Sequence, residues 1–333
     1  MVTIRVPATT ANLGPGYDVL GLALAVWMQV SVEPAERFSI EVHGEGEKEI
    51  KCDETNLIVQ SCAMAFKKAG KPFPPLAFTV HSQIPFGCGC GSSSAAAVAG
   101  YAAGMQLCGL TLGTTEREEL LEVIAELEGH PDNAAPAIYG GCQLGYRNTA
   151  GHTSTVRIPF PPNLSIVIFS PSKKMKQSTH VTRGLVADTI KLHDAVFNIS
   201  RTAMIVAALS SNNTRILREC LGEKIHQDAR AARLFPHFNK CVQAAMRAGA
   251  AYTFLSGAGP SVCAFVPGRV GEPLLQPPSE RIAEVVAERM VAAARAVGVD
   301  GRAVITHATD VGAHFVGTCA VSDNVVYLGS SKL

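Results

Sequence analysis

Residues 84–94 read Ile84-Pro85-Phe86-Gly87-Cys88-Gly89-Cys90-Gly91-Ser92-Ser93-Ser94, a glycine-rich loop between two regular segments. A strand-like segment, 76–80, precedes the loop, and an alanine-rich segment typical of a buried helix, 94–105, follows it. Because glycine has no Cβ, three glycines at alternate positions let successive backbone N–H groups converge on one anion. The N-terminus of the next helix adds partial positive charge there. The loop therefore predicts a phosphate site that needs no lysine.

The hydroxyl groups of residues 92–94 can add donors to such a site or contact Mg²⁺. A plain tight turn with serine N-caps is the alternative structure. Two common phosphate loops are excluded. The Walker loop requires Gly-Lys-Ser/Thr, but Gly70-Lys71 is followed by Pro72. The dinucleotide-binding fingerprint requires a third glycine at the position that Ser94 occupies. The pattern therefore indicates a phosphate loop of another kind.

Outward from this loop, strand-like and helix-like segments alternate through the whole chain, which favours an α+β fold. The proline-rich segment 159–162 is the best candidate for a linker, so we expect two domains, residues 1–160 and 161–333. The expected strands are 2–6, 20–32, 38–42, 76–80, 164–169, 253–255 and 262–265, with 304–306 and 315–320 closing a sheet. The expected helices are 56–69, 94–105, 115–127, 186–209, 213–221, 236–247 and 280–297.

The composition of the 333 residues excludes several classes of protein. A formal net charge of +1 gives no field that would attract nucleic acid. The most apolar run, 94–105, falls short of the ~20 residues that cross a bilayer, and the N-terminus does not resemble a signal peptide, so we expect no membrane contact and a cytoplasmic protein. The ten cysteines form no Cys-x-x-Cys pair, which leaves a thiol-bound metal as a remote alternative and favours free thiols.

Three further stretches carry polar residues in patterns that suit chemistry. In the Gly/Pro-rich loop 7–18, Asn12 and Asp18 can present an amide and a carboxylate in fixed directions, with ordinary Asx turns as the alternative. The stretch 125–133 ends a helix at two glutamates, Glu126 and Glu128, and continues as His-Pro-Asp-Asn. A carboxylate at this helix end could hold Mg²⁺ near the serines, although a solvated helix face is the alternative.

Arginines suited to a carboxylate ligand come from two places in the second half of the chain. Arg183 lies four residues after Thr179, so the two share one face if this segment is helical. Arg230 comes from a separate segment. Guanidinium groups bind carboxylates through two parallel hydrogen bonds, which suits an amino-acid substrate, while an exposed surface position is the alternative for each.

Together these stretches resemble the GHMP kinases, named for galactokinase, homoserine kinase, mevalonate kinase and phosphomevalonate kinase. Proline followed by a Gly-Leu-Gly-Ser-Ser-Ala type of core matches 85–94, with Cys90 in place of the usual Leu and Ser94 in place of the usual Ala. The strings 7–18 and 125–141 resemble the homoserine kinase branch, with Tyr17 in place of Phe. The glycine loop 254–262 resembles the third motif of the family. The resemblance covers nearly the whole chain.

The resemblance implies a fold and an activity. The fold would pair an N-terminal domain like domain 2 of ribosomal protein S5 with a ferredoxin-like C-terminal domain. The activity would be ATP- and Mg²⁺-dependent phosphorylation of the L-homoserine hydroxyl, a step in threonine biosynthesis, by an enzyme expected to be a homodimer. A kinase for another small alcohol such as mevalonate, or a non-catalytic nucleotide-binding relative, is the alternative.

The resemblance also implies a role for each candidate residue. Residues of the loop would bind ATP, namely Pro85, Gly87, Gly89, Cys90, Gly91, Ser92, Ser93 and Ser94. Ser93 and Glu128 would hold Mg²⁺, with Glu126 as the rival carboxylate. Substrate contacts would come from Asn12, Asp18, His130, Thr179, Arg183 and Arg230, with Asp18 at the ammonium and the two arginines at the carboxylate. Asn133 and Asp132 would be catalytic, Asn133 near the hydroxyl and Asp132 either as a general base or in positioning.

Overall fold

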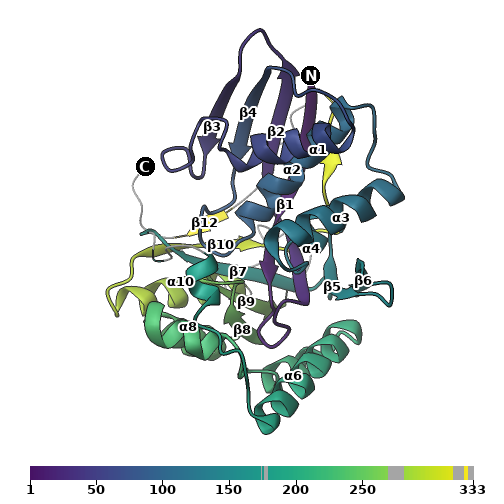
Figure 1. The fold of residues 1–333 in the computed structure, drawn as a ribbon. Coiled ribbons are helices and arrows are strands. Elements are labelled where there is room, and N and C mark those ends of the chain that lie inside the picture. The colour runs from purple at the N-terminus through teal and green to yellow at the C-terminus, as the bar shows by residue number, and fades with distance from the viewer. Residues whose placement is uncertain (174, 176–178, 269–280, 318–325, 329–333) are drawn as a thin grey trace.

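The computed structural model describes residues 1–173, 175, 179–268, 281–317 and 326–328, which form two β-sheets with helices around them (Figure 1). The seven-stranded first sheet has the order β11-β1-β2-β4-β3, and a β5–β6 hairpin extends it from β2. Its strands are β1 (Val2–Ala11), β2 (Leu20–Pro34), β3 (Ser39–Gly44), β4 (Leu76–Ser82), β5 (Cys142–Arg147), β6 (Thr153–Ile158) and β11 (His314–Phe315). All its pairs are antiparallel except β3 with β4.

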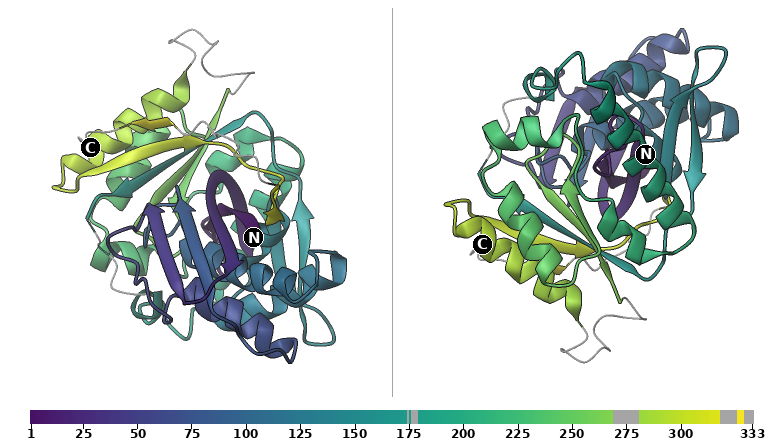
Figure 2. Two further views of the ribbon diagram at one scale, coloured as in Figure 1. Left: turned by 90° about the horizontal axis from the view of Figure 1, so that it is seen from above. Right: turned by 90° about the horizontal axis from the view of Figure 1, so that it is seen from below.

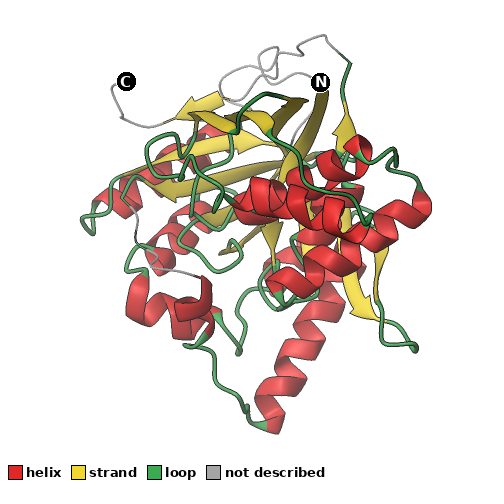
Figure 3. Ribbon diagram, turned by 45° about the horizontal axis from the view of Figure 1, so that its top comes forward, coloured by secondary structure: helices red, strands yellow, loops and turns green. Residues whose placement is uncertain are grey.

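The second sheet has five strands in the antiparallel order β12-β10-β7-β9-β8. They are β7 (Leu164–Pro171), β8 (Tyr252–Leu255), β9 (Val262–Pro267), β10 (Gly301–Thr306) and β12 (Val326–Leu328). The described helices are α1 (Leu57–Lys68), α2 (Ser92–Leu107), α3 (Thr114–Glu128), α4 (Ala134–Tyr139), α5 (Thr179–Arg183), α6 (Leu192–Ser210), α7 (Thr214–Glu219), α8 (Gln227–Leu234), α9 (Phe238–Arg247) and α10 (Ile282–Arg295). In Figure 3 the strands lie together toward the back, with most helices in front of and below them.

Helix α2 lies at the centre of the first half and confirms the predicted small-residue helix. Its side chains are buried from Ser94 to Met105 apart from Ala96. Helix α1 packs directly on its backbone, since a Cβ added at Gly100 would lie 2.1 Å from the Ile58 carbonyl oxygen. The alanine and glycine content of α2 therefore permits close helix packing, and this packing fixes where the N-terminus of α2 points.

Strand β7 separates two cores because its successive side chains point to opposite faces. Ile166 and Ile168 join the larger core, which the second sheet shares with the first. Val167 and Phe169 face the smaller core beneath α9 and α10. Figure 2 shows helix α10, in yellow-green, on the side of the second sheet away from the purple strands of the first. One continuous core thus joins the two sheets and holds the loops between them in place.

The change from the first sheet to the second falls between Ile158 and Leu164, close to the predicted linker. The two-domain division at residue 160 stays a prediction. The expectation that 304–306 and 315–320 close one sheet is wrong, because β10 joins the second sheet whereas Phe315 of β11 pairs with Ile4 of β1. Residues 318–320 lie outside the described residues. No helix in the described part of the chain is long and apolar enough to cross a membrane.

Candidate active site

The loop 84–91 connects β4 to the N-terminus of α2, as predicted, and two of its glycines are required by the local geometry. Gly89 and Gly91 have φ angles of 81° and 69°, in the left-handed region that disfavours other residues. A Cβ on Gly89 would lie 2.3 Å from the Ser256 carbonyl oxygen, and one on Gly91 would lie 1.9 Å from Thr9 Oγ1. The loop can therefore follow this path only with glycine at both positions.

A cavity of about 660 Å³ opens over this loop and the first turn of α2. Near α2 it is lined by Gly87, Gly89, Gly91, Ser92, Ser93, Ser94, Glu128, His130 and Asn133. Farther away its wall includes apolar and polar residues of 42–58. Pro85 and Cys90 are buried and line a separate small void instead, so they shape the loop from beneath rather than face the cavity.

The structure separates the two glutamates near the end of α3. Glu128 lines the cavity, and Ser94 Oγ lies 2.6 Å from each of its carboxylate oxygens. Glu126 is exposed and lines a different surface hollow between α3 and the β5–β6 hairpin. Ser93 is exposed and lines the same cavity as Glu128. A hydroxyl and a carboxylate beside a phosphate loop are oxygen donors of the kind Mg²⁺ takes, so the residues present fit this ion.

Three loops meet around the cavity and are tied together by buried hydrogen bonds. Ser256 Oγ, from the glycine loop after β8, lies 2.7 Å from the Gly89 carbonyl oxygen and 2.8 Å from Thr10 Oγ1. The Asn12 amide nitrogen donates to the Gly257 carbonyl at 3.0 Å, and its oxygen accepts from the Asp18 backbone N–H at 3.0 Å. Both ends of the Asn12 side chain thus fix the loop that carries Asp18.

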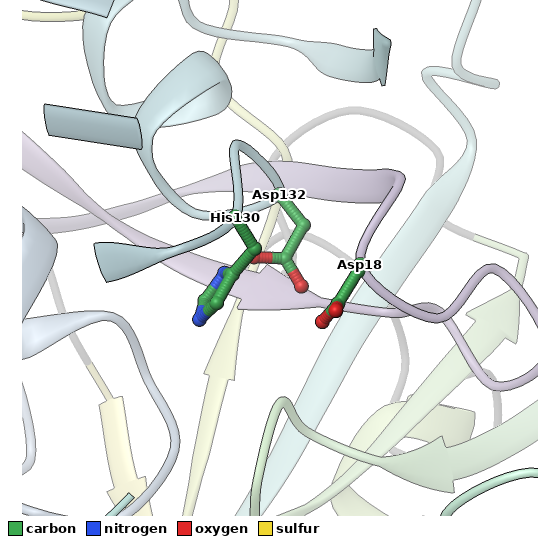
Figure 4. A group of neighbouring side chains, drawn as sticks. All are labelled: Asp18, His130 and Asp132. Atoms are coloured by element: carbon green, nitrogen blue, oxygen red, sulfur yellow. The ribbon is translucent and has the colours of Figure 1, made fainter. Parts of the chain in front are cut away.

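Asp18, His130 and Asp132 lie close together (Figure 4), and His130 also lines the cavity. One potential ligand atom from each lies within 4.8 Å of the others. The His130 imidazole contacts the Asp132 carboxylate through Nδ1, and Asn133 Nδ2 donates to the same carboxylate oxygen at 3.3 Å. Thr9 Oγ1 donates to Asn133 Oδ1 at 2.7 Å, which fixes the orientation of the Asn133 amide.

The electrostatics of this cluster are dominated by its carboxylates. Burial alone would lower the pKa of His130, but the Asp132, Glu128 and Asp18 carboxylates outweigh burial and raise it above its ordinary value. Burial, followed by the negative charge of Asp132, raises the pKa of Asp18, while Arg183 opposes this rise. The cluster is therefore a pocket of negative potential suited to a cationic group.

Positive charge lies directly beside this cluster. The Arg183 guanidinium forms an ion pair with the Asp18 carboxylate. Arg230 is 2% exposed and donates to the carbonyl oxygens of Thr182 at 3.2 Å and Gly257 at 3.3 Å. The Tyr17 ring lies between the arginines, its centroid 5.7 Å from Arg183 Cζ and 5.5 Å from Arg230 Cζ. Two guanidinium groups thus lie next to the carboxylate of Asp18 and its acidic neighbour Asp132.

Sequence reasoning assigned no role to His226, which orients Arg230. Burial, reinforced by Arg230, lowers the pKa of His226 to about 3, so the ring is neutral. Its Nε2 lies 2.8 Å from the Gly14 carbonyl oxygen and its Nδ1 lies 3.1 Å from Arg230 Nη1. One tautomer satisfies both contacts, with Nε2 donating and Nδ1 accepting. The spacing of four residues to Arg230 was the available signal for this pair.

The structure brings together most residues predicted for the site. Glu128, His130 and Asn133 line the cavity with the loop. Asp18 and Asp132 lie next to His130, and Arg183 and Arg230 lie close to Asp18 and Tyr17. Thr179 begins α5, but its side chain lies outside the described residues. Thr9 was missed as a partner of Asn133, because the expected strand ended at residue 6 whereas β1 runs on to Ala11 and buries Thr9.

Comparisons with known proteins agree with this geometry. Residues 56–141 match the family described as GHMP kinases N terminal domain, and residues 205–295 match the GHMP kinases C terminal family. The homoserine kinase of Moorella thermoacetica is 39% identical over 269 residues, 81% of this chain and 88% of that enzyme. That of Desulfitobacterium hafniense is 35% identical over 94% of this chain and 99% of its own length. The crystal structure of homoserine kinase from Cytophaga hutchinsonii superposes with a TM-score of 0.78 at 26% identity, covering 95% of this chain and 97% of that one.

Proposed function

This chain belongs to the homoserine kinases of the GHMP kinase family, and we propose that it transfers the γ-phosphoryl group of ATP to the side-chain hydroxyl of L-homoserine. The products are O-phospho-L-homoserine, an intermediate of threonine biosynthesis, and ADP. The observation that carries this proposal is the pairing of a phosphate loop under one cavity with a zwitterion site beside His130, which lines that cavity. The zwitterion site consists of Asp18, Arg183 and Arg230.

At the phosphate end, the backbone of residues 85–94 binds the triphosphate of ATP. The converging N–H groups and the helix N-terminus supply local positive potential in a chain whose net charge is only +1. Ser93 and Glu128 hold Mg²⁺, because they line the same cavity wall, whereas Glu126 faces another hollow. When bound, Mg²⁺ neutralises charge on the phosphate oxygens.

At the substrate end, Asp18 binds the ammonium group of homoserine, and Arg183 with Arg230 binds its carboxylate. The Asp18–Arg183 ion pair supports this assignment. The ammonium group of a zwitterion can pair with Asp18 while its carboxylate pairs with Arg183, so two ion pairs replace one. Arg230 is held by Thr182, His226 and Gly257, so its guanidinium needs little reorganisation on binding. Thr179 is proposed as a further hydroxyl beside the substrate.

Between the two ends, Asn133 and His130 orient the substrate hydroxyl, and Asp132 holds both of them. The contacts of Asp132 with the His130 imidazole and the Asn133 amide support positioning as its main role. Asn12 contributes by fixing the backbone of Asp18. Alignment of the hydroxyl with the γ-phosphoryl group and neutralisation of charge then account for catalysis.

The substrate assignment is tested by ADP release from ATP in the presence of L-homoserine, mevalonate, galactose or shikimate. We expect release that depends on homoserine, because mevalonate has no ammonium group and would leave the Asp18 carboxylate without a partner. Release with mevalonate but not with homoserine would make the chain a GHMP kinase for another alcohol. Nucleotide binding without release for any alcohol would make it a non-catalytic relative.

Two further parts of the proposal concern the state of the enzyme. We place it in the cytoplasm, because every described cysteine is a free thiol, which suits a reducing compartment. We also propose a homodimer, for which light scattering on the purified protein is the test. A monomeric mass across micromolar concentrations would contradict the dimer.

A further inference from the structure

Ser94 occupies a position where the resembled family usually has alanine, and its hydroxyl makes one specific contact. Ser94 Oγ lies 2.6 Å from both Oε1 and Oε2 of Glu128, and Ser94 is 1% exposed. We propose that Ser94 is a positioning residue that holds the Glu128 carboxylate in the orientation needed for a divalent cation. This inference rests on the proposed function, in which Glu128 is a Mg²⁺ ligand.

The need for such a holder follows from the position of Glu128 in the chain. It is the last residue of α3, and the next residue, Gly129, turns away in the left-handed conformation with a φ of 82°. A partly exposed glutamate at a helix end has several rotamers, and fixing one of them costs conformational entropy. A hydrogen bond from a buried hydroxyl to the carboxylate is charge-assisted and selects one rotamer before any cation arrives.

The bond leaves the carboxylate able to coordinate. An ionised carboxylate has about four lone-pair sites, and one hydroxyl proton occupies one of them. Both oxygens lie equally near Ser94 Oγ, so this contact fixes the plane of the carboxylate. This arrangement resembles the hydrogen bonds that commonly orient metal-ligating side chains from behind.

The two adjacent serines have different environments on α2. Consecutive side chains on a helix point about 100° apart, so Ser93 and Ser94 cannot face the same direction. Ser93 is exposed to the cavity, whereas Ser94 is buried against Glu128. Ser93 therefore suits direct contact with the cation, whereas the hydroxyl of Ser94, which also lines the cavity, is directed to Glu128.

The test compares the Ser94→Ala variant with wild type in Mn²⁺ binding, measured by electron paramagnetic resonance on the enzyme with ADP. We expect the Mn²⁺ dissociation constant to rise about tenfold, the lower range for loss of a bond that orients a ligand. The Mg²⁺ concentration for half-maximal activity should rise in parallel, and the KM for homoserine should stay within about twofold. Ser61→Ala is the matched control, since Ser61 is buried on α1 and its hydroxyl has no hydrogen-bond partner.

A double-mutant cycle separates positioning from general loss of structure. In the Glu128→Gln background, Ser94→Ala should change the Mn²⁺ dissociation constant by less than about twofold, because the carboxylate that Ser94 orients is no longer present. An unchanged constant in Ser94→Ala alone, or an equal loss in both backgrounds, would overturn the inference. Failure of the proposed function is a separate result, namely wild type that releases no ADP with homoserine, and the Mn²⁺ measurement still decides the role of Ser94.

Discussion

The Arg183 guanidinium is ion-paired with the Asp18 carboxylate, although the two residues are 165 positions apart in the sequence. The two side chains are partly exposed, 35% for Arg183 and 28% for Asp18, so a ligand can reach the pair. An amino-acid zwitterion has an ammonium group that can pair with Asp18 and a carboxylate that can pair with Arg183. We therefore regard this ion pair as the feature that selects homoserine over uncharged alcohols of similar size.

Asp18→Asn should weaken homoserine binding selectively. Loss of one partner of a partly desolvated ion pair costs about 2 kcal/mol, which corresponds to a rise of roughly 30-fold in the KM for homoserine. The KM for ATP should stay within about twofold, because Asp18 is not among the residues that line the cavity over the phosphate loop. Steady-state kinetics with each substrate varied in turn measures both constants. A defect confined to ATP would place Asp18 at the wrong end of the site.

Arg230→Ala should raise the homoserine requirement and also lower stability. The substitution leaves His226 Nδ1 without its buried donor, whereas the Gly257 carbonyl keeps the Asn12 amide, at a cost of about 1–3 kcal/mol for unfolding. Arg233→Ala on the same helix is the matched control, since Arg233 is exposed. Urea unfolding and homoserine kinetics are the measurements. Equal effects of the two substitutions would show that burial of Arg230 has no bearing on the site.

Ser93→Ala should reduce turnover much more than stability. Ser93 is exposed, so its hydroxyl supports no buried network, and loss of a proposed Mg²⁺ contact should lower kcat about tenfold or more. Thermal unfolding should shift by no more than about 1 °C. Removal of divalent cations with a chelator should abolish activity in both wild type and variant. A variant with wild-type kcat and wild-type Mg²⁺ dependence would refute the role given to Ser93.

The pKa of His130 predicts a pH dependence of stability. The carboxylates raise the pKa of His130 in the folded state above its unfolded value of about 6.5. Protonation of His130 therefore stabilises the fold, and this contribution is complete at pH values below the unfolded pKa. This contribution is lost as pH rises through the folded pKa. The unfolding free energy of wild type minus that of His130→Asn should therefore be largest near pH ~6 and fall toward pH ~9. In the Asp132→Asn background the trend should flatten, and an unchanged trend there would contradict the proposed cause.

The sequence was sufficient to predict a glycine-rich loop between a strand and a helix at 84–91, and its binding of phosphate stays a prediction. Gly89 and Gly91 are required by left-handed backbone angles and by close neighbours, and only glycine meets such demands without strain. The helix after the loop was equally predictable, since its run of alanine and glycine suits close packing against α1. These are features in which a short segment determines its own conformation.

Contacts between distant segments could not be predicted in the same way. Which serine reaches Glu128 depends on how α2 is rotated against α3, and a spacing pattern contains no such angle. The Asp18–Arg183 pair joins the loop before β2 to α5, and the contact of Thr9 with Asn133 joins β1 to the start of α4, so both depend on how distant segments pack. The return of β11 to β1 was missed because a two-residue strand has no periodicity to detect.

The most direct measurement of the central claim is identification of the product formed from ATP and L-homoserine by ³¹P NMR with proton correlation. The account predicts a phosphomonoester on the side-chain oxygen of homoserine, formed in equal amount to ADP. It also predicts that 4-hydroxybutanoate, which lacks the ammonium group, is phosphorylated with a kcat/KM lower by about 100-fold or more. ADP formation without a homoserine phosphoester, or equal kcat/KM for the two alcohols, would contradict it.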